Sequence, residues 1–302
     1  MEMINSLTIV IPVKADGRDI SRLGDFIERI HVRTIVVQDG THPKTNFELE
    51  SFVESKSDHI TLIRGIFGSP GFSRNAGLDA ANTNFVMFFD SDDVYPSNDV
   101  IDQFFHAAKT GLADISAGQY HVMHCLKNES QLVEVPNRFE DLLLDNVGIW
   151  RMIFRLDFIR SHDLRFEPTL MGEDLLFLLD CLALRPRFSA SSFPVYTYIM
   201  GDPSQATNST RARDNYSLLL DGLAFRYYSV SKPIDNILVA RIWLKTIIYC
   251  LIKGNLALRR KMSSHFFHSL CHNTRLVLHS LSEVSWLVSR KWRSTKANSM
   301  EF

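Results

Sequence analysis

Three aspartates, Asp90, Asp92 and Asp93, follow an uninterrupted apolar run from Phe85 to Phe89. A run without polar side chains is typical of a strand that is covered on both faces in a parallel sheet. Ligands of such sheets bind beyond the carboxyl ends of the strands, so the pattern places Asp90 and Asp92 where a ligand would lie. Alternation points both carboxylates the same way while Ser91 points away, so they can share one divalent cation and its bound diphosphate.

The acidic residues also have a purely structural interpretation. Aspartates are common in turns, and Asp93 or Ser97 could cap the helix that follows. The residues upstream favour a role in chemistry. A glycine-bearing loop at 68–71 opens a predicted helix with Arg74 in its first turns, so that helix, strand and acidic turn follow one another.

Four short segments together resemble the nucleotide-binding half of the family 2 inverting glycosyltransferases. They are Ile-Pro-Val at 11–13, Asp-Gly-Thr at 39–41, Ser-Arg-Asn-Ala-Gly at 73–77 and Asp-Ser-Asp-Asp at 90–93. Each segment is a weak signal alone, but their order over about ninety residues makes the resemblance strong. It implies an α/β protein of the GT-A fold, with a Rossmann-like, mostly parallel central sheet flanked by helices.

The resemblance also implies roles for individual residues. The donor would be bound by Pro12, Val13, Asp39, Arg74 and Asp90. Asp39 would contact the base, Asp90 would lie near the ribose, and Asp92 would bind the metal, for which Mn²⁺ or Mg²⁺ suits the oxygen ligands. The implied reaction is a single displacement with inversion at the sugar carbon, in which the cation stabilises the charge on the departing diphosphate. Judged from local sequence alone, Asp39 could equally be a turn former before Gly40, and Arg74 a surface charge.

A second block, residues 148–177, is similar to the acceptor-side segment of the same family. It contains Trp150, a predicted short strand at Phe166–Glu167, and the acidic pair Glu173 and Asp174 at the start of a predicted helix. In the family the aspartate matching Asp174 is the catalytic base, which takes the proton of the acceptor hydroxyl as it attacks. Alternatively, the pair only complements the helix dipole, an effect of less than about 1 kcal/mol at a surface.

Departures from the family pattern concern the donor. Lys14 and Ala15 stand where an aromatic residue and an asparagine are usual, Gln38 precedes Asp39 where paired acids are common, and Ile199 stands where an arginine often occurs. The base therefore stays open, with a uridine diphosphate sugar as the first choice. Another cation would have to meet the diphosphate. The candidates are Lys14, Arg211 and Arg213.

Basic residues concentrate near the C-terminus. Residues 241–296 carry eleven lysines and arginines against one acid, Glu283, which leaves a net charge of −11 on the rest of the chain. Such a tail predicts an anionic partner. Residues 237–253 are apolar with helical periodicity, so packing as a helical subdomain is favoured there. Around Trp286 and Trp292 an anionic membrane surface is favoured. No nucleic-acid recognition motif is visible, and we expect no nucleic-acid partner.

These patterns predict a division of the chain into a glycosyltransferase domain at 1–205 and a helical basic region at 206–302. Within the first, residues 1–115 would form the nucleotide-binding half and 116–205 the acceptor half. The opening residues lack a basic start, and the apolar run from Leu7 to Val13 is short. They therefore predict a cytoplasmic protein. The basic tail predicts that it is peripheral on the inner face of the cell membrane.

The predicted function is transfer of a sugar from a nucleotide-sugar donor to a cell-surface glycan, such as a capsule or lipopolysaccharide chain on a lipid-linked acceptor. Two alternatives remain open. A nucleotidyltransferase with a similar sheet would explain Asp90 and Asp92 but gives Asp174 no task. A non-catalytic module that binds nucleotide sugars would keep the fold without the reaction.

Overall fold

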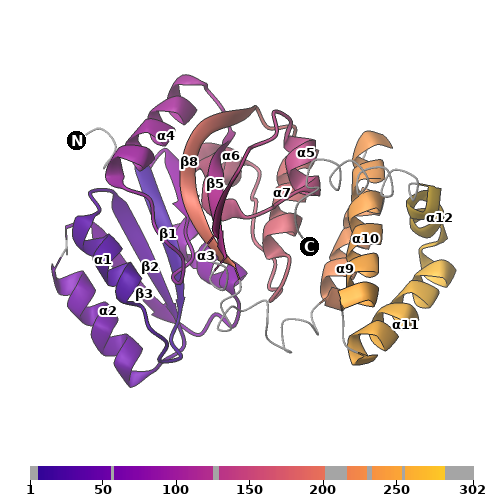
Figure 1. Cartoon of the computed structure of the whole chain (residues 1–302), viewed down its shortest axis with the longest axis horizontal. Coiled ribbons are helices and arrows are strands. Elements are labelled where there is room, and N and C mark those ends of the chain that lie inside the picture. Colours follow the sequence, from indigo (N-terminus) through magenta and orange to yellow (C-terminus); the bar gives the residue numbers. More distant parts are fainter. Residues whose placement is uncertain are drawn as a thin grey trace. The chain divides into compact units, whose positions relative to one another are not determined.

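The computed structural model describes residues 6–55, 58–124, 129–200, 216–229, 233–253 and 256–282. The chain forms two compact units, Met1–Asn208 and Ser209–Phe302. The described part of the first contains a sheet with helices on both faces, and that of the second contains helices (Figure 1). The expected boundary after residue 205 stays a prediction, and each unit is described by itself.

One eight-stranded sheet organises the N-terminal unit in the order β3-β2-β1-β4-β7-β5-β6, with β8 paired to β5. Its parallel half comprises β1 (Leu7–Lys14), β2 (Arg33–Asp39), β3 (Ile60–Gly65) and β4 (Phe85–Phe88). The second half comprises β5 (Ile115–His124), β6 (Glu129–Val133), β7 (Met152–Arg155) and β8 (Phe188–Met200). β7 lies antiparallel to β4 and β5, whereas β8 runs parallel to β5. The predicted fold class is confirmed.

The apolar run after Asn84 forms a strand buried on both faces, as predicted. All four residues of β4 are buried, and Phe88 pairs with Val10 of β1. Along the neighbouring strands, Lys14 pairs with Asp39 and Asp39 pairs with Gly65. Parallel strands end at the same edge, so Asp39 and the residues after β4 belong to one edge of the sheet.

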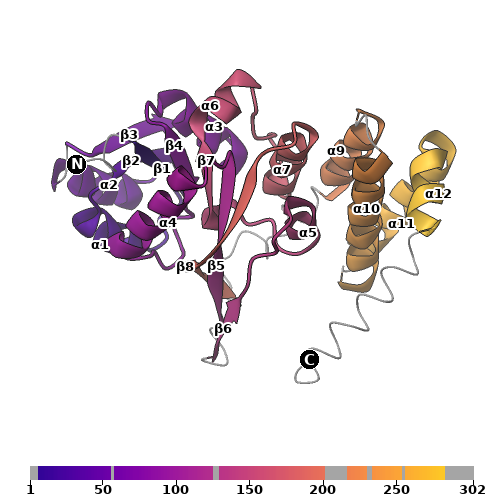
Figure 2. The same cartoon turned by 90° about the horizontal axis from the view of Figure 1, so that it is seen from above.

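Helices cover the two faces of this sheet (Figure 2). One face packs on α1 (Ser21–Arg29), α2 (Pro43–Ser55) and α4 (Asn98–Thr110) through a single apolar core. The other face meets α3 (Pro70–Ala80) so closely that a Cβ at Gly77 would lie 2.3 Å from the Val10 side chain. The remaining elements are α5 (Phe139–Leu144), the 3₁₀ helix η1 (Ile149–Arg151), α6 (Leu156–Ser161) and α7 (Glu173–Ala183).

Four helices make up the described part of the C-terminal unit: α9 (Tyr216–Ser229), α10 (Pro233–Lys253), α11 (Leu256–His272) and α12 (Thr274–Ser282). α10 packs against the other three and buries Val239, Trp243 and Ile247. Packing therefore accounts for this stretch, as favoured from its periodicity. None of the helices in the described ranges is long and apolar enough to cross a membrane. Trp286 and Trp292 lie outside the described residues.

Candidate functional site

Arg74 is the centre of a cluster of carboxylates. Its side chain is only 4% exposed, and its guanidinium donates to Asp90 Oδ1 at 2.8 Å, Glu173 Oε1 at 2.9 Å and Asp174 Oδ1 at 3.2 Å. Three elements meet here, because α3 carries Arg74, the turn after β4 carries Asp90, and α7 begins with the acidic pair. The two predicted motifs are thus joined by one side chain.

The start of α3 is fixed by its own residues and by a neighbouring segment. Ser69 accepts a hydrogen bond from the Phe72 N–H at 3.2 Å and caps the helix. The Asn75 side chain bonds both the N–H and the C=O of Phe166, each at 2.9 Å. The prediction of a strand at Phe166–Glu167 is wrong, because Asn75 satisfies this backbone in place of a neighbouring strand.

The prediction that the acidic pair opens a helix is confirmed, since α7 begins at Glu173 directly after Gly172. The backbone N–H of Ile149 lies beside Asp174. The pKa of Asp174 is raised to about 8: burial is the largest cause, the charges of Glu173 and Asp90 also raise it, and Arg74 and the Ile149 N–H lower it. A carboxylate with this pKa binds a proton more strongly than an ordinary aspartate at neutral pH.

The acidic residues after β4 do not continue the strand. Residues 91–93 form a turn, so the expectation that alternation points Asp90 and Asp92 the same way is wrong. One Asp90 oxygen faces Arg74, while Asp92 Oδ2 lies 3.9 Å from the Arg18 guanidinium. The Asp92 carbonyl accepts from Arg22 at 3.0 Å. Both aspartate side chains remain partly exposed to solvent.

Asp93 points into the protein and does not cap a helix. Its Oδ2 accepts from the Tyr196 hydroxyl at 3.1 Å and its Oδ1 from the Ile199 N–H at 3.2 Å. The pKa of Asp93 is raised to about 8, mainly by burial and also by the charges of Asp90 and Asp92. Ser97 precedes α4 but makes no side-chain cap bond. The contact between Asp93 and β8 was missed, because no local pattern connects residues 103 positions apart.

Asp39 closes β2 at the same edge of the sheet. It accepts hydrogen bonds from the N–H groups of Phe67 at 2.6 Å and Gly68 at 3.1 Å, and so holds the loop between β3 and α3. Pro12 and Val13 lie near the end of β1, between the strands that lead to Asp39 and Asp90. With neighbouring strands about 4.8 Å apart, two strand spacings separate the ends of β2 and β4 by about 10 Å. This is the length scale of a nucleoside diphosphate.

The residues that depart from the family pattern occupy different surroundings. Gln38 is fully buried and donates to the Gly40 carbonyl and to Asn46 Oδ1, so its amide faces α2. Lys14 is exposed and lies 3.4 Å from Asp16. The other two candidate cations, Arg211 and Arg213, lie outside the described residues.

The described residues contain no group of three or more His, Cys, Asp or Glu side chains placed to hold a metal ion. A small divalent cation that binds together with a nucleotide needs fewer protein ligands, because one or two carboxylates suffice when substrate phosphates and water complete its coordination. Asp92 and Asp90 are partly exposed oxygen donors at the ligand-binding edge, and Arg74 contacts Asp90, Glu173 and Asp174. These residues fit Mn²⁺ or Mg²⁺.

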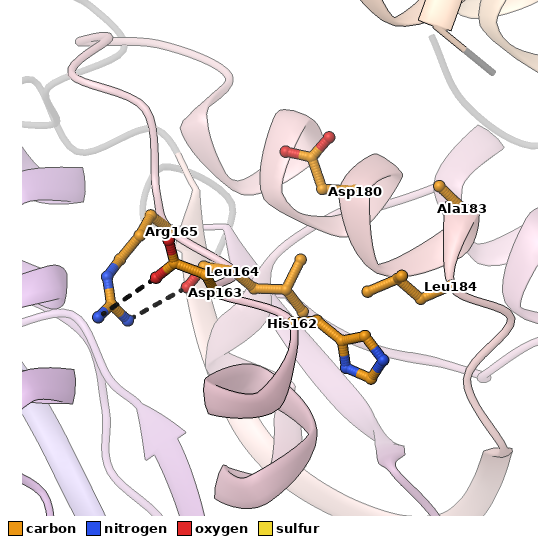
Figure 3. Close-up of a pocket in the computed structure, with 7 residues that line it drawn as sticks. All are labelled: His162, Asp163, Leu164, Arg165, Asp180, Ala183 and Leu184. Carbon is orange, nitrogen blue, oxygen red and sulfur yellow. Dashed lines mark hydrogen bonds and ion pairs between the residues drawn. The ribbon is translucent and has the colours of Figure 1, made fainter.

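A separate pocket of about 380 Å³ lies at the far ends of α6 and α7 (Figure 3). Its lining is formed by His162, Asp163, Leu164, Arg165, Asp180, Ala183 and Leu184. Arg165 pairs with Asp79 near the end of α3, the helix that leads into the start of β4, so this pocket belongs to the opposite edge of the sheet from Asp90. None of the predicted site residues lines it.

Residues 8–163 match the family model described as Glycosyl transferase family 2. The matched segment is more than half of the 302-residue chain. The chain belongs to this family. The resemblance inferred from the sequence motifs is thereby confirmed.

Two relatives of this family 2 chain are named for polysaccharide synthesis. The chain is 28% identical over 212 residues to the succinoglycan biosynthesis protein ExoW of Rhizobium meliloti, covering 60% of the chain and 65% of that protein. It is 25% identical over 187 residues to ExoO of the same organism, covering 57% and 53%. The chain therefore spans less than two thirds of the length of these curated relatives.

Two solved structures share the fold of the chain. Residues 1–349 of S. aureus TarS in complex with UDP superpose with a TM-score of 0.59 at 15% identity, covering 82% of this chain and 72% of that one. The mannosyltransferase PcManGT from Pyrobaculum calidifontis, in complex with GDP-Man and Mn²⁺, superposes with a TM-score of 0.52 at 12% identity, covering 93% and 87%. The family 2 chain thus has the GT-A fold.

Proposed function

We propose that this family 2 chain is a metal-dependent inverting glycosyltransferase that moves a sugar from a nucleotide-sugar donor to a cell-surface glycan. The observation that carries the proposal is the bridge formed by Arg74. It joins Asp90, at the edge where a GT-A protein binds its nucleotide, to Asp174, the proposed base. One cluster thereby holds groups for both partners of a sugar transfer.

The donor would lie across the ends of β2, β1 and β4. In this arrangement Asp39 meets the base, Pro12 and Val13 line the middle, and Asp90 lies near the ribose. The distance of about 10 Å between the outer strand ends suits a nucleoside diphosphate. TarS is known with UDP and with UDP-GlcNAc, and PcManGT with GDP-Man. A UDP-sugar is the first choice for this chain, and a GDP-sugar is the other outcome of a donor screen.

Asp92 would hold the divalent cation, with Asp90 beside it. Once bound, Mn²⁺ or Mg²⁺ would stabilise the negative charge that develops on the departing diphosphate. The turn at residues 91–93 presents Asp92 to solvent at the nucleotide edge, whereas Asp93 is turned inward by Tyr196 and Ile199. Asp92 is therefore the better placed of these two carboxylates to meet a ligand.

Asp174 would act as the general base. Its raised pKa makes the ionised carboxylate a stronger base towards an acceptor hydroxyl than a fully exposed aspartate with a pKa near 4. Arg74 keeps a positive charge beside it, which favours the ionised carboxylate over the protonated one. The charge on Glu173 acts in the opposite direction and strengthens the base.

The acceptor would be an extracellular or cell-surface glycan, built on a lipid carrier at the inner face of the membrane. The succinoglycan relatives support a polysaccharide acceptor. The basic residues of the C-terminal region support binding to anionic lipid, worth about 1 kcal/mol for each base near the surface. Removing residues 282–302, with four lysines and arginines and two tryptophans, should release the protein from anionic vesicles in a flotation assay. Equal flotation of both proteins would contradict this part of the proposal.

Donor turnover without acceptor distinguishes the proposed reaction from its alternatives. Slow release of free sugar and nucleoside diphosphate from a nucleotide sugar supports a glycosyltransferase. Release of inorganic diphosphate from a nucleoside triphosphate supplied with a sugar 1-phosphate supports a nucleotidyltransferase. A protein that binds the donor and releases neither product would be a binding module.

The metal site is tested with Asp92→Asn. The change is nearly isosteric but removes a charge, so Mn²⁺-dependent donor binding should weaken by at least about tenfold, or about 1.4 kcal/mol, while the fold is kept. Titration calorimetry with UDP and Mn²⁺ measures this. The matched control is Asp163→Asn, an exposed aspartate at the opposite edge of the sheet, which should bind as wild type. An unchanged metal-dependent affinity in Asp92→Asn would overturn the assignment.

A further inference from the structure

The end of β8 holds the acidic turn at several points. The Tyr196 hydroxyl accepts a hydrogen bond from the Asp90 N–H at 3.2 Å and donates one to Asp93 Oδ2 at 3.1 Å. The Ile199 N–H donates to the other Asp93 oxygen, and Val94 forms a bridge with Thr197. Both ends of the turn that carries Asp92 are therefore tied to one strand.

The ring of Tyr196 makes a second contact, with the acceptor-side segment. It stacks on Trp150 of η1, with ring centroids 4.6 Å apart and an interplanar angle of 19°. Trp150 is buried and folds back onto Gly148, where a Cβ would lie 2.3 Å from the indole. The backbone N–H of Ile149, the residue between Gly148 and Trp150, lies beside Asp174. One short segment thus contacts both Tyr196 and the proposed base.

Two routes therefore connect the acidic turn with Asp174. The route through Arg74 consists of ion pairs, whose strength changes when a cation and a diphosphate bring new charges to the site. The route through Trp150 and Tyr196 consists of ring stacking and hydrogen bonds in a buried environment. Its geometry depends much less on the charge of a ligand. It can keep the turn in place while ligands bind and leave.

We propose that Tyr196 is a positioning residue: it anchors the Asp90–Asp93 turn to Trp150 and thereby sets the geometry in which the turn binds metal and donor. Nothing in Tyr196 needs to touch the substrate, because its effect passes through the Asp90 backbone and the Asp93 carboxyl. The inference rests on the proposed function, since it takes the turn as the metal-binding element.

The test uses Tyr196→Phe, which keeps the stacked ring and removes only the hydroxyl. The Asp90 N–H then loses its acceptor, so amide hydrogen exchange at residues 90–93 should become several-fold faster in the ligand-free protein. The Mn²⁺ concentration for half-maximal UDP binding should rise about tenfold, which corresponds to about 1.4 kcal/mol. At saturating Mn²⁺, UDP binding should return towards the wild-type level.

The matched control is Tyr120→Phe. Tyr120 meets the same indole edge-on at 4.8 Å, but its hydroxyl accepts a hydrogen bond from Asn146 at 2.8 Å, away from the acidic turn. This variant should keep the wild-type Mn²⁺ requirement, even if its melting temperature falls. Trp150→Phe reduces the ring area on which Tyr196 stacks and should raise the Mn²⁺ requirement by a smaller factor. It replaces Tyr196→Phe as the test if that variant does not fold.

The possible results distinguish a failure of the positioning role of Tyr196 from a failure of the proposed function. A wild-type Mn²⁺ requirement in Tyr196→Phe, or an equal rise in Tyr120→Phe, overturns the positioning role and leaves the proposed function standing. A wild-type protein whose UDP binding does not depend on Mn²⁺ overturns the proposed metal site, and the present inference with it.

Discussion

The acidic turn after β4 and the acidic pair at the start of α7 share one arginine, but their surroundings differ. In the turn, the side chains of Asp90 and Asp92 are 33% and 37% exposed. In the pair, those of Glu173 and Asp174 are 12% and 18% exposed. A carboxylate that water reaches can exchange that water for a cation and its phosphates. An enclosed carboxylate instead gains affinity for a proton. The same residue type therefore suits two tasks a few ångströms apart.

The largest expected effect separates the two tasks. Asp174→Asn removes the proposed base, which acts in the transition state, so turnover should fall by roughly two to four orders of magnitude while donor affinity stays near wild type. Steady-state kinetics and calorimetry with the donor measure both quantities. Asp92→Asn should do the opposite and weaken donor binding.

Glu173→Gln is the control for this prediction, because Glu173 contacts the same Arg74 nitrogen. If Glu173→Gln is inactive and Asp174→Asn turns over normally, the two roles are exchanged. If both variants are active, the pair has no catalytic task, and the binding-module alternative gains support.

Arg74→Met should affect the acidic turn and the acidic pair together, because it removes the positive charge that both contact. Breaking a buried ion pair leaves the partner carboxylates uncompensated, and the free energy of unfolding should fall by about 3–5 kcal/mol. Urea unfolding measures this. Arg165→Met is the matched control, since Arg165 pairs with Asp79 at 3.0 Å on the surface and should cost no more than about 1 kcal/mol. Equal losses in the two variants would show that the Arg74 cluster adds no stability beyond that of a surface pair.

Much of this site could be predicted from short-range patterns. The apolar run before Asp90 predicts a buried strand with its ligand edge beyond it, and the positions of Glu173 and Asp174 predict the start of a helix. Both predictions depend on residues within a few positions of one another, where backbone geometry dictates the outcome. The directions of the side chains in the acidic turn could not be predicted, because side chains alternate only while the chain remains a strand, and β4 ends before Asp90.

The contacts between the motifs could not be predicted in this way. Arg74 meets Glu173 and Asp174 across 99 and 100 positions of the chain, and Asp93 meets Tyr196 across 103. These pairings depend on how α3, α7 and β8 pack, which no single segment encodes. The prediction of a strand at Phe166–Glu167 was wrong for the same reason. Asn75, on a helix about ninety positions earlier in the chain, forms hydrogen bonds with the Phe166 backbone that a neighbouring strand would otherwise form.

The pH dependence of turnover reports on Asp174, the enclosed carboxylate, separately from the acidic turn. Asp174 must be ionised to act as a base, and its folded-state pKa is raised to about 8. Turnover should therefore rise by up to about tenfold per pH unit below that value and then level off. The folded protein also holds this proton more tightly than the unfolded chain. Binding of this proton therefore adds to the free energy of unfolding in acid, and this contribution is lost as the pH rises from about 4 to 8.

Asp174→Asn should remove this contribution to the pH dependence of stability, measured as melting temperature against pH in the absence of metal. A wild-type turnover that is already constant from about pH 6 upwards would show that Arg74 holds the pKa of Asp174 close to that of an ordinary carboxyl.

The smallest expected effect concerns how the two helices of the cluster begin. α3, which carries Arg74, starts with a side-chain cap, because the Ser69 hydroxyl accepts from the Phe72 N–H. α7 starts after Gly172, at a φ of 80° and without a side-chain cap, so its acidic residues are what complements the helix dipole. Ser69→Ala should therefore lower the free energy of unfolding by about 1 kcal/mol.

Ser97→Ala is the matched control for the cap. Ser97 occupies the same position before α4 but makes no side-chain cap bond, so its loss should change the free energy of unfolding by less than about 0.5 kcal/mol. Urea unfolding of both variants gives the comparison. If Ser69→Ala costs no more than Ser97→Ala, the start of α3 is held by the Asn75 and Phe166 contacts alone, and the position of Arg74 does not depend on its cap.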